Sequence, residues 1–278
     1  MPGSDCKINT SLYNHHMDVL VIFPILFGAI IALVINYLGD ILPASFFHLQ
    51  PRCPREACGA AFSWKEYILL ADCSTCGQRS RLRPILVLIL VLAAALGFWF
   101  APPRAVVPGY ALLIFGYLLL LAVIDLEHHL LPLSLLLAGV LIVGIAGLLL
   151  HGWLDTLLGG LAGFLTMGIF HLFGRLYTHL QRRRHPEAPR SQDEALAFGD
   201  VLLGGLLGLL LGWPAILQGI FLGALLAALY SLVVILSLLS QGKASDRLVY
   251  TFIPLGPPFI LAAWAMIFLP GWVNGTLS

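Results

Sequence analysis

The sequence predicts an all-α polytopic membrane protein with about eight transmembrane helices and one small, zinc-ribbon-like loop. Three observations lead to this fold class. The 278 residues are 59% hydrophobic and only 10% charged, whereas about a quarter of the residues in soluble domains are charged. The mean hydropathy is +0.94. Long apolar runs recur along the chain and reach the roughly 20 residues that a helix needs to cross the hydrocarbon core.

The apolar runs define the expected helices in order. The segment before Val19 has Lys7 as its only Lys or Arg, unlike the basic region of a removable signal peptide, so the first helix should be retained. The run that ends at Gly212 is short, and Trp213-Pro214 indicates a tight turn after it. The spans are expected at residues 19–38, 85–101, 109–125, 132–150, 156–176, 200–212, 214–239 and 249–270.

Three regions follow from these spans. Residues 1–38 form an N-terminal segment with the first helix, residues 39–84 form a loop with four cysteines, and residues 85–278 form the membrane core. Within the core, Gly159-Gly160-x-x-Gly163 and Gly204-Gly205-x-x-Gly208 are typical of helices that pack closely in membranes.

Basic residues predict the orientation, because short loops rich in Lys and Arg stay in the cytoplasm. Connections on the opposite side hold only Arg104. The cysteine loop therefore faces the cytoplasm, and both termini lie outside. Lys plus Arg (15) nearly balance Asp plus Glu (14), so no basic surface for nucleic acid is expected. The basic connections contain Arg52, Arg55, Lys65, Arg79, Arg81, Arg83, Arg182, Arg183, Arg184, Arg190, Lys243 and Arg247.

Four cysteines in the loop are spaced like the ligands of a zinc ribbon. Four residues separate Cys53 from Cys58, two separate Cys73 from Cys76, and 14 lie between the pairs. Such spacing lets two turns offer four thiolates to one tetrahedral ion. Disulfides or ordinary buried thiols are the alternatives, and a reducing cytoplasm disfavours disulfides. With four protein ligands the ion would be structural rather than catalytic.

Two aspartates stand at the cytoplasmic ends of expected helices. Asp125 follows an apolar run, and Asp200 precedes one. A carboxylate at such a position is costly and often functional. Two neighbouring carboxylates that share one proton can activate water and protonate an amide carbonyl. Gly199 would permit close backbone approach. Alternatively, Asp200 is a helix N-cap, and Asp125 is an interfacial residue paired with His128, His129 or Arg175.

These residues together resemble the type IV prepilin peptidases, which are membrane aspartic proteases with a Gly-x-Gly-Asp motif. The resemblance extends from Asn36 to the last helix. Its blocks are Asn36 with Leu42-Pro43, the two Cys-Gly pairs, Asp125 through Pro132, Phe198-Gly199-Asp200-Val201, and the segment from Ile253 to Pro257 that includes Pro254 and Gly256.

The resemblance implies an aspartic endopeptidase of the bacterial cytoplasmic (inner) membrane, with Asp125 and Asp200 as the catalytic pair. Its expected partners are the lipid bilayer and prepilin or pseudopilin precursors, from which it would remove a leader. Many members of the family also methylate the new N-terminus with S-adenosylmethionine, whereas the structural zinc is expected from the cysteine spacing. The chain departs from the family pattern at Ala32, Ile41, Leu133, Ala197 and Leu202.

Two other functions compete with this interpretation. A non-catalytic scaffold could bind pilin precursors or assembly proteins without cutting them, although a scaffold needs neither aspartate. A transporter could use the two aspartates as proton carriers. Broken helices in matching halves would indicate transport, and the sequence does not show them.

Overall fold

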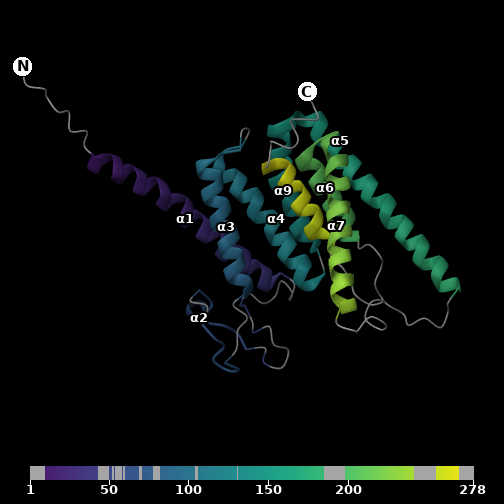
Figure 1. Cartoon of the computed structure of the whole chain (residues 1–278), viewed down its shortest axis with the longest axis horizontal. Helices are drawn as coiled ribbons and strands as arrows, with labels where there is room; N and C mark the ends of the chain where they lie inside the picture. The colour runs from purple at the N-terminus through teal and green to yellow at the C-terminus, as the bar shows by residue number, and fades with distance from the viewer. Residues whose placement is uncertain are drawn as a thin grey trace, which may run out of the picture. The chain divides into compact units, whose positions relative to one another are not determined.

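The computed structural model is all-helical (Figure 1). It describes residues 10–42, 50–51, 53, 58, 60–68, 71–77, 82–103, 106–129, 131–184, 198–240 and 255–268. Within these ranges lie α1 (Thr10–Ile41), α2 (Trp64–Ile68), α3 (Leu82–Phe100), α4 (Pro108–His128), α5 (Leu133–Arg184), α6 (Phe198–Leu211), α7 (Ala215–Ser240) and α9 (Gly256–Phe268). The chain forms two compact units, residues 1–116 and 117–278, and α4 contributes to both.

The predicted membrane fold is confirmed. Helices α1, α3, α4, α5 and α7 include stretches that are long and apolar enough to cross a bilayer, and α6 and α9 are shorter apolar helices. These seven helices account for the eight expected apolar runs, because α5 includes two of them. The number of spans and their orientation stay predictions. The first part of the run at 249–270 lies outside the described residues, as do most of the basic residues that predicted the orientation.

Helix α5 joins two runs that were expected to be separate spans. Its apolar stretch is 48 residues long, which at 1.5 Å per residue is about 72 Å, more than twice the roughly 30 Å of the hydrocarbon core. Gly152 has non-helical backbone angles (φ 80°, ψ 172°) inside it. Thr156 donates its hydroxyl to the Gly152 carbonyl at 2.7 Å. A single glycine with positive φ therefore replaces the longer connection that was expected between the runs.

The first unit is built on α1 and α3. These helices pack closely where Gly28 faces Ala95, since a Cβ built at Gly28 would lie 3.1 Å from the Ala95 Cβ. Phe23 of α1 contacts Trp99 of α3 with ring centroids 5.5 Å apart. The last turn of α1 and the first turn of α3 also share polar contacts, which connect them to the cysteine-rich segment described below.

In the second unit, α5 and α6 have the most extensive contact. The two glycine patterns predicted from the sequence face each other there. A Cβ at Gly163 would collide with the Gly204 carbonyl oxygen, and a Cβ at Gly208 would collide with that of Gly159. Close backbone approach of this kind is how small residues support helix association in membranes. The prediction of tight packing at these glycines is confirmed.

The middle of α4 is fixed against the first turn of α5. Tyr117 donates its hydroxyl to the Leu135 carbonyl at 2.9 Å, and the tyrosine fits because Gly139 has no side chain there. Pro132 precedes α5, and its carbonyl accepts the amides of Leu135 and Leu136 at 3.0 and 3.1 Å. The segment after α4 is thereby held where α5 begins.

Replacing Gly163 with alanine tests the contact between α5 and α6. The added methyl would collide with backbone that cannot move without separating the helices, so we expect a loss of about 1–3 kcal/mol. Thermal unfolding in detergent, followed by tryptophan fluorescence, measures the change. Gly144→Ala is the matched control, because no atom lies within 4 Å of a Cβ at Gly144. Equal midpoints for the two variants would contradict the packing argument.

Candidate active site and metal centre

Asp125 lies in the last turn of α4 and is only 5% exposed. Its Oδ2 accepts a hydrogen bond of 3.0 Å from the amide of Gly256, the first residue of α9. A Cβ at Gly256 would lie 2.5 Å from the same oxygen, so the contact requires glycine. His129 has a φ of 52° and donates its amide to the Asp125 carbonyl at 3.0 Å, where α4 ends. Asp125 is thus shielded from solvent, and a pairing with His128, His129 or Arg175 stays the alternative to a catalytic role.

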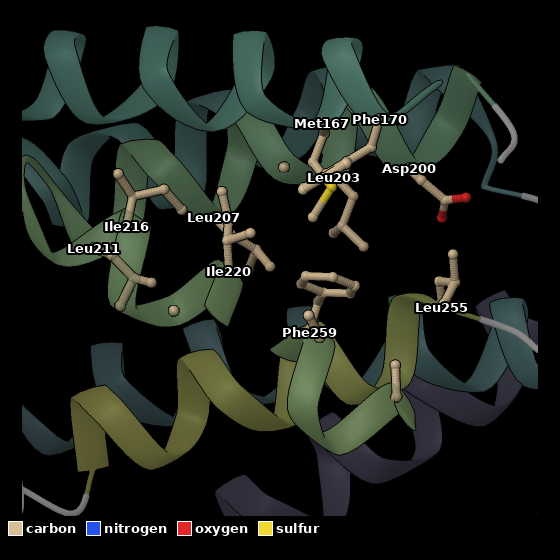
Figure 2. A pocket seen from close by; sticks show the side chains of 14 residues that line it. Met167, Phe170, Asp200, Leu203, Leu207, Leu211, Ile216, Ile220, Leu255 and Phe259 are labelled. Atoms are coloured by element: carbon tan, nitrogen blue, oxygen red, sulfur yellow. The ribbon is translucent and has the colours of Figure 1, made fainter. Parts of the chain in front are cut away.

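Asp200 lies in the first turn of α6 and is half-buried. It is the third residue of the helix rather than the N-cap, so the capping alternative does not describe its position. A carboxylate in the first turn of a helix is still stabilised, because the free amides there and the helix dipole attract negative charge. Asp200 borders a cavity of about 340 Å³, and Leu255 and Phe259 line the same cavity (Figure 2).

The segment that begins α9 connects the two aspartates. Leu255 lines the cavity with Asp200, and the next residue, Gly256, donates its amide to Asp125. A second connection comes from Gly199, where a Cβ would lie 3.0 Å from the Cβ of Leu131. Leu131 follows α4 closely, and Gly199 precedes Asp200. The C-terminal end of α4, which carries Asp125, therefore lies near the N-terminal ends of α6, which carries Asp200, and of α9.

The residues expected to support the two aspartates lie at the following places in the structure. Gly199 and Gly256 make close contacts in which a side chain would interfere. Pro132 lies at the start of α5 and supports its first turn. Pro254 lies outside the described residues. His128 and Glu127 approach each other, with Nε2 and Oε2 3.9 Å apart.

The four loop cysteines gather in the first unit. Their sulfur atoms all lie within 4.8 Å of one another. The Sγ atoms of Cys53 and Cys76 are 3.5 Å apart, and those of Cys58 and Cys73 are 3.7 Å apart. Disulfide sulfurs are about 2.05 Å apart, so none of the four forms a disulfide. The cysteine module, meaning the described residues between Cys53 and Gly77 with α2 among them, has a core of Cys53, Phe62, Tyr67 and Cys73.

Local hydrogen bonds shape the module. Ser63 and Glu66 form a reciprocal capping box at α2: the Ser63 amide donates to Glu66 Oε2 at 3.0 Å, and the Glu66 amide donates to Ser63 Oγ at 3.4 Å. Gly77 has a φ of 67° and donates its amide to the Cys73 carbonyl at 2.8 Å. The turn expected after Cys76 is confirmed, whereas Gly59, where a second turn was expected, lies outside the described residues.

The thiols of the module differ in acidity. The backbone amides of Cys76 and Thr75 donate to the Cys73 sulfur and lower the pKa of Cys73 to about 6. At Cys58 the Ala60 amide lowers the pKa, but burial and hydrogen bonds with Cys73 and Cys76 outweigh it, so the pKa is raised. Metals bind the thiolate form. Cys73 is therefore the more acidic of these two thiols, and a bound cation would favour the thiolate form of Cys58 as well.

The donor set fits a tetrahedral metal ion. Four sulfurs at the usual Zn–S distance of about 2.3 Å from one ion would be about 3.8 Å apart. This is close to the distances of 3.5 Å between the Cys53 and Cys76 sulfurs and 3.7 Å between the Cys58 and Cys73 sulfurs. The prediction that the four cysteines form one cluster able to hold a metal is confirmed, and the identity of the metal is a proposal.

Sequence reasoning missed a polar network beside the module. Asp40 accepts hydrogen bonds from the Tyr67 hydroxyl at 2.5 Å and from Arg83 Nη2 at 2.6 Å. The same Arg83 nitrogen also donates to the Asn36 carbonyl at 3.0 Å. Asp40 and Arg83 lie at opposite ends of the 39–84 loop in the sequence. These two opposite charges were the feature from which an ion pair closing the loop could have been predicted. The network joins the module to both α1 and α3.

Comparison with known proteins agrees with this arrangement. A family model described as the type IV leader peptidase family matches residues 112–232. The prepilin leader peptidase/N-methyltransferase of Myxococcus xanthus is 32% identical over 253 residues, which cover 86% of this chain and 69% of that protein. The chain belongs to the type IV leader peptidase family. No solved structure matches it. The part matched by the leader peptidase model contains both Asp125 and Asp200.

The metal cluster can be tested by replacing Cys73 and Cys76 with serine. Losing two of four ligands should release the metal and lower the unfolding temperature of the cysteine module, because metal-binding energy is folding energy in small modules. Elemental analysis and thermal unfolding of the purified protein measure both effects. Cys6→Ser is the control, since Cys6 lies outside the paired spacing. A wild-type protein without zinc or iron would contradict a metal-binding role.

Proposed function

We propose that this chain is an aspartic endopeptidase of the bacterial cytoplasmic membrane that removes the leader peptide from type IV prepilin-like or pseudopilin precursors. The observation that carries the proposal is the convergence of Asp125 and Asp200 on the start of α9. Membership of the leader peptidase family and the name of the Myxococcus xanthus relative, a prepilin leader peptidase/N-methyltransferase, support the choice of substrate.

In the proposed reaction the two carboxylates divide the roles of acid and base. The charged aspartate takes a proton from a water molecule, whose oxygen bonds to the scissile carbonyl carbon, while the protonated aspartate donates to the carbonyl oxygen. Collapse of this intermediate returns a hydroxyl proton to the second aspartate and breaks the carbon–nitrogen bond, and the leaving nitrogen takes the proton that the first aspartate removed from water. The products are a leader with a new carboxylate and a mature chain with a new amino terminus.

The contact between Gly256 and Asp125 suits this role. The amide holds Oδ2 in place, which leaves Oδ1 to act on the water. Because the donor is backbone, it cannot rotate away as a side chain can. We assign Asp125 and Asp200 the catalytic roles, and Gly199, Pro132, Pro254 and Gly256 the role of supporting them, although Pro254 lies outside the described residues.

The proposal also includes the orientation of the chain in the membrane and a structural metal ion. The cysteine loop and both aspartates face the cytoplasm and the termini lie outside, as the basic residues indicate. Cys53, Cys58, Cys73 and Cys76 hold a structural zinc ion, which folds the cysteine module. The regions 1–38, 39–84 and 85–278 are, in this scheme, the first-helix segment, the metal loop and the peptidase core.

N-methylation with S-adenosylmethionine is supported only by the name of the relative. In the first unit, a cavity beside Asn36 has a volume of about 190 Å³ and mostly apolar walls. Small-molecule sites usually measure roughly 300–1,000 Å³, so this cavity does not fit a charged nucleoside cofactor. We derive no step through that cofactor.

Cleavage of a prepilin-type precursor in liposomes tests the peptidase proposal. We expect the wild-type chain to release the leader, and Asp125→Asn or Asp200→Asn to slow release by about 10²–10⁴-fold or more, because each removes a general acid or base. A gel that resolves the leader from the mature chain measures the rate. Precursor binding without cleavage by folded wild-type protein would instead identify a non-catalytic scaffold.

Gly256→Ala tests the positioning of Asp125. The added methyl would displace the carboxylate from the amide that holds it, and a shift of about 1 Å at a catalytic group can cost about 100-fold in rate. We therefore expect slower cleavage with little change in precursor binding. Gly168→Ala is the control, because the nearest atom to a Cβ there is 3.8 Å away. Full activity in folded Gly256→Ala would contradict the role given to this contact.

A further inference from the structure

The two aspartates stand at opposite kinds of helix end. Asp200 lies in the first turn of α6, where the helix dipole favours a negative charge. Asp125 lies in the last turn of α4, where the dipole disfavours a negative charge, and it is only 5% exposed. By these two effects alone, a charge shared by the pair would reside on Asp200. Positive groups near Asp125 therefore determine whether Asp125 can be the charged member.

Two groups of positive character approach Asp125. The first is the Gly256 amide at the N-terminal end of α9, which donates to Oδ2 at 3.0 Å. The second is His129, four residues after Asp125, which interacts electrostatically with the carboxylate. The imidazole is exposed, whereas the carboxylate is buried. A positive charge on His129 therefore keeps its hydration, and at the same time it favours the negative form of Asp125.

The backbone holds His129 at this place. Its φ of 52° lies in the left-handed region, and its amide donates to the Asp125 carbonyl at 3.0 Å. Among the described residues, His129 is the only one other than glycine with a positive φ. Glycine would adopt this conformation without strain. A strained residue of this kind is typical of positions where the side chain has a function.

The other ionisable groups of the converging helices are arranged differently. His128 is also exposed, but its Nε2 lies 3.9 Å from Oε2 of Glu127. Helix α9 carries no ionisable side chain. His171 of α5 packs its ring against Phe198 at the start of α6, and Arg175 follows one turn later along α5. His128 thus provides a matched comparison for its neighbour.

We infer that His129 is a positioning residue that keeps Asp125 ionised, so that Asp125 is the charged member of the pair and Asp200 the protonated one. This inference rests on the proposed peptidase function and assigns its two roles. Asp125 takes the proton from water, and Asp200 donates to the carbonyl oxygen. Because a pairing with His129 is also the alternative to a catalytic role for Asp125, the charge of Asp125 and the cleavage of precursor are measured separately.

Infrared spectroscopy of the carboxylic acid C=O stretch measures the charge of Asp125 without substrate. All proteins carry Asp200→Asn, and the band is assigned by its loss when Asp125→Asn is added. At about pH 6, where an ordinary histidine is mostly protonated, His129→Asn should raise the ratio of protonated to ionised Asp125 by about tenfold. His129→Lys and the control His128→Asn should leave the ratio unchanged. Asparagine is the neutral replacement because it tolerates a left-handed backbone. An unchanged ratio in His129→Asn would overturn the inference.

Cleavage by proteins with both aspartates then tests the assigned roles. On the acidic side of the pH profile, His129→Asn should lower kcat by about tenfold with little change in KM, because fewer molecules carry the charged base. His129→Lys should restore most of kcat, and His128→Asn should retain it. An equal loss in folded His129→Asn and His129→Lys would indicate a merely structural role and overturn the inference. If the wild-type chain cleaved no precursor, the peptidase proposal would fail, whereas the infrared ratios would still show whether His129 keeps Asp125 ionised.

Discussion

The hydrogen bond from the Gly256 amide to Asp125 is the interaction on which the arrangement of the site depends. A buried carboxylate without a donor is strongly unfavourable in apolar surroundings. The chain supplies the donor from the first residue of α9, 131 positions away in the sequence. Because free amides at a helix start have no partner within the helix, one contact satisfies both groups. It also brings the start of α9 to the end of α4, and with it the residues that border Asp200.

Helix α6 combines tight packing with open space. Its glycines allow close contact with α5, yet Gly204 and Leu207 also line the cavity beside Asp200. Close approach on one face holds the helix rigidly, so that the cavity on another face keeps its shape without side chains filling it. Asp200, which we propose as catalytic, lies in the first turn of this helix and therefore has a fixed position relative to the cavity. Rigid placement of this kind is what lets a site discriminate between substrates.

Local patterns in the sequence predicted much of this structure. Apolar runs predicted the helices because the membrane imposes their length and composition. The paired spacing of cysteines predicted the cluster, and the position of Asp125 and Asp200 at the ends of runs predicted their convergence. The break between the runs 132–150 and 156–176 was also predicted, and in the structure it falls at Gly152. The Gly256 contact, the network of Asp40 and the cavity were missed because they depend on which distant segments pack together.

The division of the chain separates the proposed chemistry from the metal. Both aspartates, the Gly256 donor and the apolar cavity belong to the unit formed by residues 117–278, whereas all four cysteines belong to the unit before it. The module is attached to the helices of its own unit through Asp40, which accepts from Tyr67 of α2 and from Arg83 of α3. Tyr67 is also part of the core formed with Cys53 and Cys73. A metal ion held by the four cysteines would therefore stabilise the side chain that anchors the module, without taking part in the proposed cleavage step.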